Sequence, residues 1–127
     1  MRILPEEEDF DPESFDSEAR AAAIREGHEH FNAKRFHEAH EAFERCWLAG
    51  EGADSDLWKG LVQASIALHH LQRKNLTGAR KLNTGMRRLL APYLPSAEGF
   101  DLAGLLREMQ AVLRTGEPPW PRLEREA

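Results

Sequence analysis

Apolar residues recur every three or four positions along most of the chain, which is the period of an amphipathic helix. Residues 56–73 carry two apolar stripes, as expected of a central helix with neighbours on two sides. Apolar and polar residues nowhere alternate as they do in a half-buried strand. The pattern predicts an all-α fold of about five helices, over residues 16–32, 35–48, 56–73, 75–92 and 101–116.

The ends of these segments carry residues that begin and end helices. Asn75 and Asp101 can each accept hydrogen bonds from a first helical turn, and Gly116 is the residue type that most often follows a last one. Acidic and proline-containing stretches flank the periodic region. We expect an acidic, disordered or extended tail over 1–15, a helical domain over 16–116, and a C-terminal tail with proline and tryptophan over 117–127.

Two stretches have the spacing of a tetratricopeptide-like helical hairpin, in which small residues let antiparallel helices approach and large residues fill the bend. The first consists of Gly27, Phe31, Phe36, Ala39 and Phe43. The second, weaker stretch consists of Ala67, Asn75, Leu76, Ala79 and Leu82. Two hairpins are fewer than the ~3 repeats that a solenoid needs. The sequence therefore predicts a compact bundle built on two antiparallel hairpins.

Composition narrows the class of protein. Cys46 is the single cysteine, so the chain has no internal disulfide framework. Acids follow the first five residues at once, which is unlike a secretory signal. No apolar run approaches the ~20 residues of a membrane span. We expect a cytoplasmic protein that does not enter membranes.

The net charge of −5 is unevenly distributed, because the N-terminal residues are acidic and residues 57–97 contain no acid. The basic residues of this range are Lys59, Arg73, Lys74, Arg80, Lys81, Arg87 and Arg88. They could bind RNA or another anion. No aromatic residues are interleaved with them to stack on bases. We therefore expect them to face acidic helices or water, and nucleic acid is not the expected partner.

Polar residues gather on one face of the second predicted helix, beside its apolar stripe. They are His37, His40, Glu41, Glu44 and Trp47, three or four residues apart. On the central helix Gln63 and His70 lie two turns apart. If these helices pack antiparallel, His40 and Glu44 meet Gln63 and His70 beside Trp47. An imidazole beside a carboxylate is the usual unit of a proton-transfer site or of a metal's inner and outer ligands.

The sequence leaves three interpretations of this set open. His40, Glu44 and His70 could coordinate a divalent metal such as zinc, with His37 as an alternative ligand. The same residues, with Glu41, could be catalytic or could bind a small ligand. A third interpretation is a buried polar network that fixes how the helices pack. The zinc-protease motif lacks its second histidine, and the Glu-x-x-His pairs of di-iron bundles are missing. Whether the chain is an enzyme stays open.

These residues also resemble a bacterial and archaeal family of unassigned function, domain-of-unknown-function 309. The resemblance covers about residues 26–90 and lies in Phe31-Asn32, the run 36–41, Glu44, Trp47, the run 60–64, the run 68–70, Asn75 and Gly78-Ala79. It implies a compact helical bundle but no activity. The characteristic positions that it carries over are Glu38, His40, Glu41, Glu44, Trp47, Gln63 and His70. One departure is Lys74, where the family usually has glycine.

Two function classes follow. The first is a pocket between the second and third helices that binds a small ligand or a divalent metal, with Glu38, Trp47 and Gln63 as binding residues. The alternative is a protein-interaction module, in which the hairpin surfaces bind a protein partner and the polar network is only structural. In that alternative the acidic tail or the segment around Trp120 is the docking element.

Overall fold

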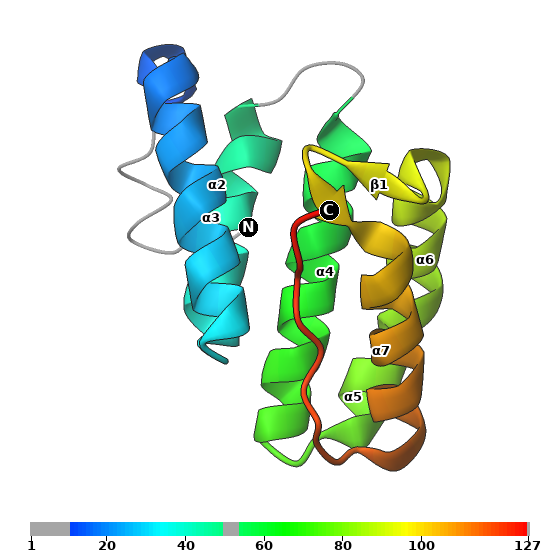
Figure 1. Ribbon diagram of the computed structural model, residues 1–127. Coiled ribbons are helices and arrows are strands. Elements are labelled where there is room, and N and C mark those ends of the chain that lie inside the picture. Colours follow the sequence, from blue (N-terminus) through cyan, green and yellow to red (C-terminus); the bar gives the residue numbers. More distant parts are fainter. Residues whose placement is uncertain (1–10, 50–53, 127) are drawn as a thin grey trace.

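The computed structural model describes residues 11–49 and 54–126. Helices α2 (Ser17–Asn32) and α3 (Phe36–Ala49) form an antiparallel pair on one side of α4 (Ser55–Gln72). Figure 1 shows α6 (Asn83–Leu90) and α7 (Leu102–Thr115) on the other side of α4, with α5 (Leu76–Lys81) leading into α6. The prediction of an all-α bundle on two helical hairpins is confirmed.

The fourth predicted helix differs from the structure in one detail, because it is divided into α5 and α6 at Leu82. The Leu82 N–H donates to the carbonyl of Ala79, three residues back, at 3.2 Å. This turn is therefore tighter than an α-helical turn. Met86 then donates to the Leu82 carbonyl at 3.0 Å, and the α-helical pattern resumes.

Short elements that the sequence pattern does not indicate flank the helices. Two are 3₁₀ turns, η1 (Pro12–Ser14) and η2 (Ala91–Tyr93). The strands β1 (Ser96–Ala97) and β2 (Phe100–Asp101) pair antiparallel, with Ala97 opposite Phe100. Strands of two residues are too short to produce an alternating pattern. Of the predicted acidic tail, residues 1–10 lie outside the described part of the chain.

The segment 117–126 runs back along the bundle, beside α4 in Figure 1. The side chain of Leu123 in this segment is buried, and side chains of α2 contact the backbone of Leu123. The Leu123 N–H donates to Asn32 Oδ1 at 2.7 Å, and the Leu123 carbonyl accepts from Asn32 Nδ2 at 3.0 Å and lies 2.8 Å from His28 Nε2. Arg125 pairs with Phe100 of β2. The segment thus connects α2 to the small sheet.

The two hairpin bends have the same backbone structure, 40 residues apart. In the first bend Lys34 N–H donates to the Phe31 carbonyl at 3.1 Å, and in the second Lys74 N–H donates to the Leu71 carbonyl at 3.0 Å. Both lysines have left-handed backbones, with φ of 66° and 63°. Glycine most often occupies this position after a helix, because it lacks a Cβ.

The first hairpin is closed by aromatic residues, as its sequence predicts. The rings of Phe31 and Phe36 meet edge to face at the bend, with centroids 5.2 Å apart. Gly27 lets α3 approach α2 so closely that a Cβ there would lie 2.4 Å from the Phe43 ring. The Phe43 ring also stacks on Trp58 of α4, with centroids 6.1 Å apart. The first hairpin therefore joins the core through aromatic contacts.

Cys46 lies in this core and is buried. Burial raises the pKa of its thiol to about 11, although the charges of Arg20 and Arg45 act in the opposite direction. The thiol is therefore neutral at pH 7 and behaves as a small apolar side chain. Over the described residues, each helix falls short of the length or the apolar composition that crossing a membrane requires.

Candidate functional site

Helices α3 and α4 pack antiparallel in a single register, which decides which predicted site residues meet. Gln72 Nε2 donates to the Lys34 carbonyl just before α3, at 2.9 Å. The rings of His37 and His69 lie 5.3 Å apart, and Lys59 Nζ lies 5.4 Å from the centre of the Trp47 ring. From His37 to Trp47 is ten residues forward along α3, and from His69 to Lys59 is ten residues back along α4.

His40 is buried in this interface, with 9% of its surface exposed. Its Nδ1 lies against the carbonyl of His37, one helical turn earlier. A carbonyl can only accept, so Nδ1 carries the proton and Nε2 holds the lone pair when the ring is neutral. The backbone of α3 thus fixes both the orientation of the ring and its tautomer.

His37 connects the acidic side of α3 with α4. Its side chain is 48% exposed, and its Nδ1 lies 3.7 Å from Oε2 of Glu41, whose side chain is 16% exposed. The ring of His37 meets the ring of His40 edge to face, with centroids 4.9 Å apart, and meets His69 on its other side. Three imidazoles and a carboxyl group therefore form one connected cluster across two helices.

His69 belongs to this cluster, whereas the helical spacing along the sequence points to its neighbour His70. Burial lowers the pKa of His69 below its usual 6.5, and the nearby charges of His37, Arg73 and His70 lower it further, against the opposing effect of Glu38. His70 instead lies against Asn75, whose Nδ2 is 3.4 Å from His70 Nδ1. The register between α3 and α4 decides which histidine of α4 meets His37, because residue 69 lies opposite residue 37.

Glu41 and Glu44 supply further buried oxygens on α3, and Gln63 supplies one on α4. Glu41 Oε2 and Glu44 Oε1 on α3, and Gln63 Oε1 on α4, are all removed from solvent. Gln63 reaches toward α6, since its Oε1 would lie 2.9 Å from a Cβ added to Gly85. Its oxygen has no hydrogen-bond partner among the described residues. A buried amide oxygen in this position is able to accept a hydrogen bond from a ligand.

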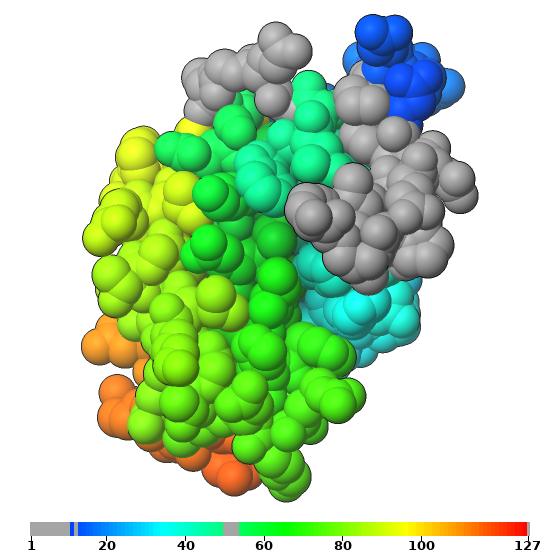
Figure 2. All heavy atoms as spheres, turned by 180° about the vertical axis from the view of Figure 1, so that it is seen from behind, coloured from blue at the N-terminus to red at the C-terminus, as the bar shows by residue number. Residues whose placement is uncertain are grey.

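The remaining predicted residues lie at the edges of this region. Trp47 is half-buried under the Lys59 ammonium group, and Glu38 is exposed at the start of α3. Figure 2 shows the surface of α4 between that of α3 and that of α5 and α6. Lys59 and Gln63 of α4 are half-buried. In residues 11–49 and 54–126, no three histidine, cysteine, aspartate or glutamate side chains are arranged to hold a metal ion.

The basic residues predicted to face acidic helices or water differ in their contacts. Arg80 is bound to the end of α7, where its Nε donates to the Leu113 carbonyl at 2.9 Å and its Nη2 to the Arg114 carbonyl at 3.0 Å. A cation at the C-terminus of a helix is favoured by the helix dipole. Arg87 and Arg88 on α6 are exposed.

Comparison with known proteins finds a family model and a relative that match part of this chain. Residues 24–82 match the family described as "Domain of unknown function (DUF309)". The chain is also 34% identical, over 86 residues, to the "Uncharacterized protein YpuF" of Bacillus subtilis (strain 168). That similarity covers 65% of this chain and 49% of the relative, so the chain matches about half of the relative's length.

Proposed function

We propose, on the premise that residues 24–82 belong to the DUF309 family, that the chain is a ligand-binding domain. We further propose that its site is the α3–α4 polar face, defined by His37, His40, Glu41, Glu44, Gln63 and His69. The ligand group that this site would take carries positive charge and N–H donors. All of these residues lie within the matched segment 24–82.

The observation that carries the proposal is the connected cluster of His37, His40, His69 and Glu41 across two helices. A lowered pKa keeps His69 neutral at pH 7, so it can offer a lone pair. Glu41 and Glu44 bring carboxyl oxygens into the same region, where partial burial strengthens their attraction for a cation. The face is therefore rich in acceptors, which favours a guanidinium or ammonium group.

The proposal is tested by titrating the protein with N-acetyl-L-argininamide while recording the imidazole resonances by NMR. N-acetyl-L-citrullinamide is the matched control ligand, because it has the same shape with a neutral urea in place of the guanidinium, and the acetyl group removes the α-ammonium charge from both ligands. We expect saturable shifts of the His37 and His69 resonances with N-acetyl-L-argininamide and far smaller shifts with N-acetyl-L-citrullinamide. Equal responses to the two ligands, or none to either, would contradict the proposal.

Variants locate the binding. Glu44→Gln should weaken the binding of N-acetyl-L-argininamide about ten-fold, because a charge-assisted hydrogen bond becomes a neutral one. Glu29→Gln, an exposed position on α2, removes the same charge elsewhere and should leave the affinity unchanged. If Glu44→Gln lowers the stability of the fold and neither ligand binds, the polar face is a structural network. The protein-interaction alternative would then take the place of the proposal.

A further inference from the structure

A hollow of about 370 Å³ lies on a different part of the molecule, between the end of α4, the start of α5 and the segment after α7. We call it the Trp120 hollow; its lining is Leu71, Gln72, Lys74, Leu76, Thr115, Gly116, Glu117, Pro118 and Trp120. Its volume falls in the range of about 300–1,000 Å³ typical of small-molecule sites. It shares no lining residue with the α3–α4 polar face.

One side of the hollow carries a cation in an unusual position. Lys74 is the left-handed residue of the second bend, with φ of 63°. A lysine there strains the backbone, and such strain is often found at functional sites. Its side chain lines the hollow and forms no ion pair with another described residue. Lys34 has the same backbone in the first bend but does not line the hollow.

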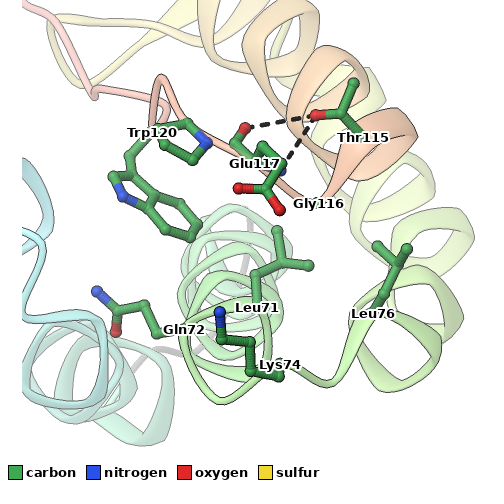
Figure 3. Close-up of a pocket in the computed structure, with 9 residues that line it drawn as sticks. Leu71, Gln72, Lys74, Leu76, Thr115, Gly116, Glu117 and Trp120 are labelled. Atoms are coloured by element: carbon green, nitrogen blue, oxygen red, sulfur yellow. Dashed lines mark hydrogen bonds between the residues drawn. The ribbon is translucent and has the colours of Figure 1, made fainter.

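The opposite side carries an anion, Glu117, which is exposed and whose backbone is held by Thr115. Thr115 Oγ1 accepts from the Glu117 N–H at 3.1 Å and lies 3.4 Å from the Glu117 carbonyl, which fixes the backbone after α7. In Figure 3 the Glu117 carboxylate and the Lys74 ammonium group approach the hollow from opposite sides of Leu71. Within the described part of the chain, the Glu117 carboxylate forms no ion pair.

Apolar side chains form the surface between these charges. Leu71 is buried and Leu76 is half-buried, and both contribute to the lining. The ring of Trp120 forms a third side (Figure 3). Trp120 is also supported by the core, because its ring lies 6.2 Å from the ring of Phe36, centroid to centroid. The hollow thus combines one cation, one anion and a fixed apolar wall.

We propose that the Trp120 hollow binds a free α-amino acid with an apolar side chain. The carboxylate of the ligand would pair with Lys74 and its ammonium group with Glu117, while its side chain lies on Leu71, Leu76 and Trp120. A cation and an anion at two separated points of the protein favour a zwitterion over a singly charged ligand. A singly charged ligand would leave either Lys74 or Glu117 without an opposite charge. This inference is independent of the function proposed for the α3–α4 polar face.

The test is a titration with L-leucine, monitored by the indole N–H resonance of Trp120, which is assigned by its loss in Trp120→Phe. L-leucinamide lacks the carboxylate and N-acetyl-L-leucine lacks the ammonium group. We expect saturable binding of L-leucine and at least about ten-fold weaker binding of both analogues, as each loses one charge-assisted contact. Binding of either analogue as tightly as L-leucine, or no response to L-leucine, would overturn the proposal.

Glycine substitutions at the two bends provide a matched pair of variants. Lys74→Gly suits the left-handed backbone, so the fold is kept while the cation is removed, and L-leucine should bind about ten-fold more weakly. Lys34→Gly makes the same change outside the hollow and should leave the affinity unchanged. Glu44→Gln should also leave it unchanged, which separates this proposal from the one for the polar face. An unaltered affinity in Lys74→Gly would refute the assigned role of the lysine.

Discussion

The two helical hairpins share a backbone plan but differ in what fills them. In the first hairpin Gly27 opposes Phe43, and the aromatic ring occupies the space that the missing Cβ leaves. The residues 40 positions later are Ala67 and Asn83, so the second hairpin has a Cβ and a small polar residue there. The Oδ1 of Asn83 is buried. The same bend can thus be filled by aromatic rings, as in the first hairpin, or have small and polar side chains, as in the second.

This difference matches the distribution of the candidate sites. The bend of the first hairpin is closed by two fully buried phenylalanines, whereas the bend of the second has half-buried Leu76 beside a hollow. The first hairpin contributes the polar face of α3, which meets α4 at His37 and His69. The first hairpin is closely packed, and the second borders a hollow. Close packing of the first hairpin makes it a rigid support for the second.

The largest expected effect is the loss of an aromatic side chain from the first bend. Phe36→Ala should destabilise the domain by about 3–5 kcal/mol, because it removes a fully buried ring and leaves a cavity. The equivalent change Leu76→Ala should cost only about 1–2 kcal/mol, since Leu76 is half-buried and borders the hollow. Urea denaturation measures both. Equal losses would show that the two bends are equally important to stability.

A smaller effect is expected from adding a Cβ where the first hairpin is tightest. Gly27→Ala should destabilise the domain by about 1–3 kcal/mol, because the new methyl group would lie 2.4–2.8 Å from atoms of the Phe43 ring. Urea denaturation with Phe43→Leu as a second change tests the cause. The smaller side chain should relieve part of the clash, so the two changes should be less than additive.

The stability of the domain should respond alike to a glycine substitution at either bend. Lys34→Gly and Lys74→Gly should each stabilise the domain by up to about 1 kcal/mol, because glycine adopts a left-handed backbone without a steric cost. Thermal unfolding followed by circular dichroism measures both changes. A gain at one bend and a loss at the other would mean that one lysine side chain contributes contacts that offset the strain.

The smallest effect concerns the pH dependence of stability. The pKa of His69 is lowered in the folded domain, so the folded state disfavours the protonated ring. Neutral His69 contributes its full share of stability above about 6.5, the pKa of the histidine in the unfolded chain. That contribution is lost as pH falls through the pKa that His69 has in the folded domain. The melting temperature should fall from pH 7.5 to pH 5.5 by less in His69→Gln than in the wild type. An identical fall in both proteins would exclude His69 as a cause.

Much of the fold could be predicted from the sequence because it depends on local periodicity. The helices and the aromatic bend of the first hairpin follow from apolar spacing and small residues. The small sheet could not be predicted, since its strands have two residues each. The turn at Leu82 could not be predicted either, because one tightened hydrogen bond does not change the apolar pattern.

The candidate site could be predicted on α3 but only in part on α4. The spacing of His37, His40, Glu41 and Glu44 defines one face of a helix, and spacing is visible in a sequence. The partner residue on α4 depends on the register between two helices, and a shift of one residue separates His69 from His70. The Trp120 hollow depends on contacts between three segments, so the sequence indicates Lys74 only as one of seven basic residues in the range 57–97 and does not indicate Glu117.

The link between Asn32 and Leu123 has a consequence for the order in which the domain folds. Its hydrogen bonds join residues 91 positions apart, whereas each hairpin forms from neighbours in the sequence. Closing so long a loop has a larger entropic cost than pairing neighbouring helices, and contacts between residues far apart in the sequence slow folding. The helical hairpins can therefore assemble first, and protection of the Leu123 amide from hydrogen exchange would mark the moment at which the chain closes on itself.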